Sequence, residues 1–300
     1  MFKRDFMEYH ADRFTDFSLM IYRKQQLKAV IPANLTQDVF FSHQGLSYGG
    51  VVIDEHIRLG ELVAIVREVL LFLHMRNIQK WYLKNIPAMY HTHPAGEIDW
   101  ILFKLQATLY RRDAAVVIDN SAQKIPYQQR RMRAVKKAAR SPFTVQLGYE
   151  QLAPFWNELL IPNLLERHGV APVHSLQEIQ RLARCFPQNI VQHNVYLNHR
   201  IVAGCTLFLN QTVAHAQYIS ANAEGRSSGG LDFLFDQLIR QTYARYRYFS
   251  FGISNENNGQ LINSGLQDWK EGFGGRTMVH DFYAIETANY PLLDHCMLVK

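Results

Sequence analysis

The sequence predicts an α/β or α+β fold in which mixed central sheets are flanked by helices. Two observations support this prediction. In the second half of the 300 residues, three consecutive strand-like segments precede a helical segment and another strand. The first half repeats the alternation of strand and helix patterns, although its residues show no repeat. Strands in this mixed order are typical of a sheet covered by helices.

In the first half, the stretch SYGGVVID (47–54) predicts a turn entering a strand. Residues 59–77 predict a helix, because apolar side chains recur with a helical period. These apolar residues are Leu62, Ile65, Val66, Val69, Leu70 and Leu73. The stretch IQKWYLKNIP (78–87) predicts the next strand, which a proline ends.

A basic segment, KIPYQQRRMRAVKKAAR (124–140), lies near the midpoint and holds seven Lys or Arg residues and no acid. It is either the solvated face of a linker helix or a docking surface for nucleic acid, phospholipid headgroups or a nucleotide-linked substrate. We therefore predict an N-terminal lobe (1–123), a basic helical linker (124–142) and a C-terminal lobe (143–300).

The C-terminal lobe begins with two predicted helices. The first (152–169) is interrupted by Pro162 and ends at Gly169. The second (175–186) begins with a capping-box pattern, with a serine followed three residues later by a glutamate. The remaining elements are a hairpin of strands 189–198 and 200–210 with a turn at Asn198-His199, a strand 212–222, a loop 223–230, a helix 231–247, a strand 248–254, a short helix 265–275 and a strand 276–286.

Composition indicates an ordinary globular protein, with 48% hydrophobic and 19% charged residues and a net charge of +6. The three cysteines have no paired spacing, which favours a reducing compartment. The apolar run 62–73 is too short to cross a bilayer and contains Arg67 and Glu68. We therefore expect a soluble cytoplasmic protein without a transmembrane segment.

Segments 45–52 (GLSYGGVV), 172–190, 214–220 (AHAQYIS) and 251–276, together with the order of elements, resemble the GNAT acyltransferase superfamily. The second half resembles one GNAT domain and the first half a degenerate second copy. Such tandem domains are similar to the two-lobed Fem-type (FemAB-like) aminoacyltransferases and to GNAT-like proteins of bacterial surface-polysaccharide gene clusters. The resemblance implies acetyl-CoA or another acyl-CoA as donor, or aminoacyl-tRNA in Fem-type relatives.

The segment AEGRSSGG (223–230) precedes a predicted helix, whose N-terminal N–H groups favour anions. It is either an ordinary connecting loop or, as the resemblance implies, the site of the donor's pyrophosphate. The residues assigned to that site are Arg226, Ser227, Ser228, Gly229 and Gly230. Leu231 departs from the GNAT pattern, which has a small residue there.

The polar run SNENNG (254–259) ends a predicted strand. It is either an Asx-turn loop that caps the next helix through Asn263 or Ser264, or a site for a hydroxyl-rich ligand. In the second interpretation, Ser254, Asn257 and Asn258 bind substrate, and Glu256 is the candidate general base. Lys270, farther on, is expected at a solvated helix end.

Strand 212–222 places His215 and Gln217 on one face by simple alternation. They are either a core pair or groups that face the acceptor, with His215 as an alternative base. Tyr283 is a candidate general acid only by the resemblance, and core packing is its alternative.

In the first half, Tyr48, Gly49 and His91 are candidate substrate-binding residues. Gly49 and Gly50 equally fit a β-bulge. His91 and His93 lack a third ligand at recognisable spacing, so we expect no metal site.

The predicted function is transfer of an acyl group from acyl-CoA to an amine, with an amino sugar of a nucleotide- or lipid-linked surface-polysaccharide precursor as the acceptor. Two alternatives remain open. One is Fem-type aminoacyl transfer from tRNA to a cell-wall precursor. The other is a catalytically inactive, GNAT-like binding protein.

Overall fold

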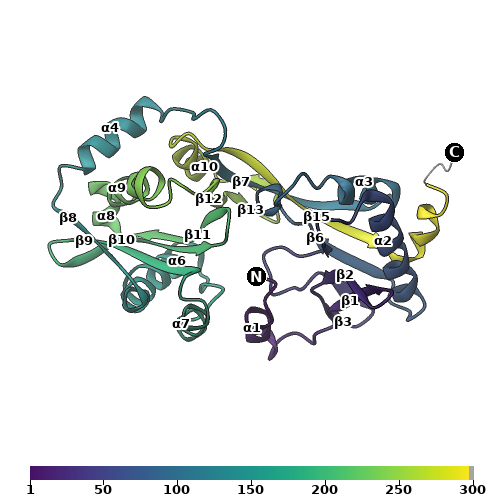
Figure 1. The fold of residues 1–300 in the computed structure, drawn as a ribbon. Helices are drawn as coiled ribbons and strands as arrows, with labels where there is room; N and C mark the ends of the chain where they lie inside the picture. Colours follow the sequence, from purple (N-terminus) through teal and green to yellow (C-terminus); the bar gives the residue numbers. More distant parts are fainter. Residues whose placement is uncertain (297–300) are drawn as a thin grey trace. The chain divides into compact units, whose positions relative to one another are not determined.

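The computed structural model describes residues 1–296, which divide into two compact units (Figure 1). Unit 1 consists of residues 1–113, 257–260 and 279–300, and unit 2 of residues 114–256 and 261–278. The chain passes from one unit to the other within strands β7 (Thr108–Asp119) and β15 (Arg276–Glu286), and also at both ends of the short segment 257–260. Each unit is therefore built from separate stretches of sequence. The lobe boundaries at 124 and 143 stay predictions.

The strands of unit 2 form a mixed sheet in the order β7-β12-β11-β10-β9-β8. Strands β8 to β11 are antiparallel neighbours, β11 and β12 are parallel, and β12 and β7 are antiparallel. Their bounds are β8 (Phe143–Leu147), β9 (Ile190–Leu197), β10 (Arg200–Leu209), β11 (Val213–Ala221) and β12 (Tyr248–Ile253). The predicted hairpin, its third strand and the strand predicted at 248–254 are thus confirmed.

Helices cover both faces of this sheet, with α4, α9 and α10 on one face and α6 and α7 on the other (Figure 1). The helices are α4 (Gln129–Ala138), α5 (Leu152–Pro154), α6 (Ile161–His168), α7 (Leu176–Cys185), α8 (Ala223–Ser228), α9 (Gly230–Gln237) and α10 (Ser264–Glu271), with π-helical segments at Phe155–Leu160 and Leu238–Thr242. Phe235, Phe249, Phe251 and Phe273 pack ring against ring in the core. The predicted fold class is confirmed.

Local capping signals form as the sequence predicts. Ser175 and Glu178 make both hydrogen bonds of a capping box at α7. Gly169 ends α6 in the left-handed conformation, with φ 65°. Asn198 and His199 take positive φ in the hairpin turn. Asn263 caps α10 by accepting the N–H of Leu266.

The prediction of a loop at 223–230 is wrong, because residues 223–228 form helix α8. Asn222 begins the helix by accepting the N–H of Gly225 through its side chain. Gly225 lies directly against the backbone carbonyl of Val202 on β10, where no side chain fits. Tertiary packing therefore requires the small residues, which the sequence pattern attributes to a loop.

Unit 1 contains a sheet in the order β3-β4-β6-β15 and a separate antiparallel sheet β1-β2-β5. The bounds are β1 (Leu19–Arg23), β2 (Gln26–Ile31), β3 (Asn34–Thr36), β4 (Val39–Phe41), β5 (Val52–Ile53) and β6 (Lys80–Lys84), with helices α1 (Arg4–Met7), α2 (Leu59–His74) and α3 (Glu97–Lys104). The predicted apolar stripe of α2 is buried in the core with Phe40 and Trp81. The predicted strand at 78–87 is confirmed as β6.

The polar run near the C-terminus folds as a small hairpin of β13 (Asn255–Glu256) and β14 (Leu261–Ile262). Asn257, Asn258 and Gly259 between the strands all have positive φ, which asparagine and glycine tolerate best. A Cβ atom at Gly259 would lie 2.5 Å from the carbonyl oxygen of Arg112. Backbone geometry thus accounts for most of the density of asparagine and glycine in this stretch.

Candidate functional site

Strands β11 and β12 of unit 2 pair only at their beginnings. The parallel register runs from Val213/Tyr248 through Ala214/Phe249 to His215/Ser250 and ends there. β11 continues to Ala221 with β10 as its partner on the other side. Pairing between the two strands therefore ends at His215, and we call the region between β11 and β12 beyond this point the β11/β12 notch.

At the end of β11, the hydrogen bonds of the Ala221 carbonyl show that no neighbouring strand pairs with it. The carbonyl oxygen of Ala221 accepts hydrogen bonds from Asn163 Nδ2, at 2.8 Å, and Arg226 Nη1, at 2.5 Å. Side chains thus satisfy a backbone group that a neighbouring strand would otherwise satisfy. An open strand edge of this kind presents alternate N–H and C=O groups to an extended ligand.

His215 lies where the two strands part. Its Nδ1 is 3.0 Å from the hydroxyl of Ser250, which also accepts the N–H of Gly252 at 3.2 Å. Ser250 is fully buried, whereas His215 is half-buried. Gly252 has φ +71°, and a Cβ there would lie 3.5 Å from His215 Cε1. The ring of His215 is therefore held between β11 and the backbone turn at Gly252.

Lys270 supports the end of β12 from inside the protein. Its side chain is 2% exposed, and Nζ donates to the carbonyl oxygens of Gly252, at 3.2 Å, and Ile253, at 2.6 Å. Burial lowers the pKa of Lys270 to about 7. The expectation of a solvated lysine is wrong, because α10 turns this side chain toward the bend of β12.

Arg226 of the proposed donor site faces the edge of the notch. Nη1 contacts Ala221 and Asn163, and the residue is exposed. A guanidinium has five N–H donors, so Nε and Nη2 keep donors for a phosphate. The hydroxyls of Ser227 and Ser228 both donate to the carbonyl oxygen of Glu224 within α8. Among the five residues assigned to the donor site, Arg226 is therefore the one whose charged side chain can donate to a phosphate.

The N-terminus of α9 already holds a carboxylate. Asp232, in its first turn, accepts from Trp269 Nε1 at 3.0 Å and pairs with Arg131 of α4. A Cβ at Gly229 would lie 3.0 Å from Cβ of Ala138 on α4, and Gly230 is buried. Helix α4 therefore packs over this end of α9, and Asp232 supplies the negative charge that a helix N-terminus favours.

Two residues of the polar run, Glu256 and Asn258, make structural contacts. Glu256 is exposed and accepts from Asn263 Nδ2 at 3.0 Å, so it lacks the burial that its proposed role as a base invokes. Asn258 lies 3.5 Å from Arg111 Nη1. Ser254 is buried, and among the described residues its hydroxyl has no hydrogen-bond partner. The roles of Glu256, Ser254, Asn257 and Asn258 stay predictions.

Gln217 does not follow simple alternation along β11. Opposite Thr206 and Leu207 of β10 lie Tyr218 and Ala216, so Gln217 is the extra residue of a β-bulge. Simple alternation along β11 therefore does not establish that Gln217 and His215 lie on the same face of the sheet, as we expected.

Tyr48, Gly49, His91 and Tyr283 all belong to unit 1. Tyr48 is buried and its ring stacks on that of Tyr90 at 4.3 Å. Gly49 is pressed against the backbone carbonyl of Ser42. The Tyr283 hydroxyl donates to Asp281 at 3.3 Å, and burial raises its pKa. Its role as a general acid stays a prediction.

The residues that sequence reasoning missed at the notch are Asn163, Ser250 and Lys270. Ser250 carried a usable signal, because a polar residue within the aromatic strand YFSFGIS needs a buried partner. Asn163 and Lys270 carried none, since their partners are backbone carbonyls distant in sequence.

None of the helices within residues 1–296 is long and apolar enough to span a membrane. In the same residues, no group of three or more His, Cys, Asp or Glu side chains is placed to hold a metal ion.

Comparison with known proteins agrees with the geometry of unit 2. Residues 123–271 match the family model described as "Acetyltransferase (GNAT) domain". None of the curated proteins matches the sequence. FemX has a similar structure, with 10% identity, a TM-score of 0.65, and coverage of 97% of this chain and 93% of FemX.

Two further solved structures have the same fold. L-PGS from Bacillus licheniformis has 11% identity, a TM-score of 0.61, and coverage of 97% of this chain and 96% of its own. The C-terminal domain of a putative lysylphosphatidylglycerol synthetase from Agrobacterium fabrum has 13% identity, a TM-score of 0.57, and coverage of 95% and 93%. Residues 123–271 therefore form a GNAT acetyltransferase domain, and the chain as a whole shares its fold with FemX.

Proposed function

We propose that the protein transfers an acyl or aminoacyl group to an amine in the β11/β12 notch of unit 2. The parting of these two parallel strands at His215 and Ser250 carries the proposal. It opens one edge of β11 beside an imidazole that is half-buried and fixed in orientation. Positioning of this kind supplies a large part of the rate enhancement when two substrates must meet.

His215 would accept the proton of the attacking amine. Ser250 Oγ has two lone pairs, so it can accept the N–H of Gly252 and also N–H from His215 Nδ1. In that tautomer Nε2 carries the lone pair that a general base requires. The amine nitrogen then bonds to the carbonyl carbon, the bond from carbon to the carrier's sulfur or oxygen breaks, and N–H groups along the β11 edge are suited to stabilise the oxyanion.

A CoA thioester is the first candidate donor. The match to a GNAT domain and the remaining N–H donors of Arg226 support it. The acceptor would be an amine on a nucleotide- or lipid-linked sugar, which suits direct attack on a thioester.

An aminoacyl-tRNA is the second candidate donor, and helix α4 favours it. Its exposed side carries Arg133, Lys136 and Lys137 beside α9, together with Arg130, which pairs with Asp268. The N-terminus of α9, where a pyrophosphate would bind, is already occupied by Asp232, which pairs with Arg131 and accepts from Trp269. A row of exposed cations is suited to a phosphate backbone, whose binding weakens steeply with salt.

The donor test compares acetyl-CoA with a mixture of aminoacyl-tRNAs, each offered with amine acceptors. Substituting the two lysines of α4 by glutamine, as K136Q/K137Q, should weaken tRNA binding and reduce its salt dependence, because two phosphate contacts are lost. Arg226→Ala should instead raise the KM for acetyl-CoA. Transfer from neither donor, with no shift in Tm at saturating concentration, would contradict the proposal and favour an inactive binding protein.

A further inference from the structure

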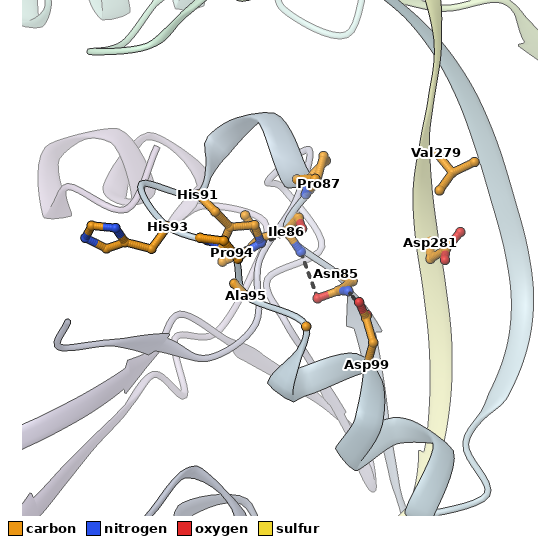
Figure 2. A pocket seen from close by; sticks show the side chains of 12 residues that line it. Asn85, Ile86, Pro87, His91, His93, Pro94, Ala95, Asp99, Val279 and Asp281 are labelled. Carbon is orange, nitrogen blue, oxygen red and sulfur yellow. Dashed lines mark hydrogen bonds between the residues drawn. The ribbon is translucent and has the colours of Figure 1, made fainter. Parts of the chain in front are cut away.

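A pocket in unit 1 takes no part in the proposed transfer site. It has a volume of about 210 Å³ and is lined from the end of β6 through the connection to α3, and by β15 (Figure 2). The residues that form its polar wall are Asn85, His91, His93, Asp99 and Asp281. Its size is below the roughly 300 Å³ at which drug-sized ligands are usually enclosed, so it suits a small molecule or one end of a larger one.

Hydrogen bonds fix this wall in place. The backbone N–H of Asn85 donates to the carbonyl oxygen of Asp281 at 2.9 Å, which joins the ends of β6 and β15. Asn85 Nδ2 donates to Asp99 Oδ1 at 3.1 Å, and Asn85 Oδ1 accepts the N–H of Ile86 at 3.0 Å. The carboxylate of Asp99 is therefore held in one orientation by an amide that is itself anchored (Figure 2).

The two carboxylates of the pocket differ in whether a positively charged side chain pairs with them. Both oxygens of Asp281 are bound by Arg112, at 2.6 and 2.7 Å. Asp99 forms no salt bridge with any residue in the described part of the chain, and its hydrogen-bond donor is a neutral amide. Asp99 is an exposed residue, and the partial burial of its carboxylate together with the negative charge of Asp281 raises its pKa. The carboxylate of the pocket that no arginine pairs with is thus that of Asp99.

The remaining wall favours cations over anions. No lysine or arginine is among the residues that line the pocket. Because a carbonyl oxygen only accepts, the 3.1 Å contact of His91 Nε2 with Ile86 places the proton on Nε2, and Nδ1 of the neutral ring is an acceptor. A ligand with several N–H donors and a positive charge fits these acceptors.

We propose that the unit 1 pocket binds the ammonium group of a small amine, with the Asp99 carboxylate as its anionic partner. The proposal does not rest on acyl transfer by unit 2, and it is testable in a protein that carries a substitution at His215. It assigns to unit 1 a ligand class that its fold alone does not indicate.

The test is an NMR titration of ¹⁵N-labelled protein near neutral pH with methylammonium, ethanolamine and glucosamine. Ethylene glycol and N-acetylglucosamine serve as uncharged controls. We expect saturable shifts of the amide signals of Ala88, Ala95 and Gly96 with the ammonium probes, and none with the controls. In Asp99→Asn, which keeps the shape of the side chain, affinity should fall at least about tenfold, the equivalent of one lost charge interaction.

Asp38→Asn is the matched variant, because Asp38 is exposed, belongs to unit 1 and lies outside the pocket lining. It should bind the probes as the unsubstituted protein does. Thermal melts of the two variants provide a check on folding. A Tm of Asp99→Asn equal to that of Asp38→Asn would show that the substitution at Asp99 keeps the fold. Equal affinity in both variants, equal binding of N-acetylglucosamine, or no saturation by any ammonium probe up to about 10 mM would overturn the proposal.

Discussion

Replacing His215 with glutamine is expected to lower the rate of acyl transfer by about 10²- to 10⁴-fold, the usual contribution of a positioned general base. Glutamine can still bond to Ser250, but it has no lone pair of comparable basicity to take the proton of the amine. The effect should appear in kcat with little change in the KM of the donor, because the imidazole acts on the reacting amine. Steady-state kinetics with whichever of the two candidate donors supports transfer would measure both.

His56→Gln is the control, since His56 is an exposed histidine of unit 1. It should leave kcat unchanged. Ser250→Ala should give an intermediate loss and shift the pH profile, because it removes the hydrogen bond that orients the ring. An unchanged kcat in His215→Gln would remove this residue from the mechanism.

The stability of the protein is expected to rise between pH 7 and pH 9.5, and Lys270→Met should abolish about 3 kcal/mol of that rise. The pKa of Lys270 is about 7 in the folded protein, against 10.5 in an exposed lysine. Between these values the unfolded chain binds a proton that the folded chain has released. The free energy of unfolding therefore increases with pH across this window, by about 1.4 kcal/mol per unit.

Urea unfolding at the two pH values measures this difference. Other groups that titrate in the window, such as Lys84, contribute to both proteins and cancel in the comparison. Lys137→Met, an exposed lysine of α4, should keep the pH dependence of the original protein. The same slope in Lys270→Met would show that Lys270 is charged, or hydrated, in the folded state.

Elements whose signals are local could be predicted from the sequence. The capping box of Ser175 and Glu178 and the cap at Asn263 satisfy neighbouring N–H groups, so a few residues determine them. The succession of strands along the chain between residues 189 and 254 followed from alternating and apolar patterns. The register of β11 and β12, which creates the notch, could not be predicted from the sequence. It depends on where two strands that are separated by α8 and α9 stop pairing.

Elements whose partners are distant in sequence could not be predicted. Strand β7 was missed because Arg111, Arg112 and Asp113 make its first part polar. Arg112 pairs with Asp281, which follows 169 residues later. Glu256 was chosen as a base for its chemical type, and the hairpin that leaves it exposed is fixed by contacts of Asn255 with β7.

The most direct measurement is hydrogen–deuterium exchange of the backbone amides of 216–221 and 250–254, with and without the donor that supports transfer. Binding of the acyl group along the open edge of β11 should slow exchange in both segments of the unsubstituted protein. The donor should slow exchange in the same two segments of Lys270→Met. Active transfer without any slowing at these residues would show that the acyl group is held elsewhere, and that β11 and β12 do not form the site of reaction.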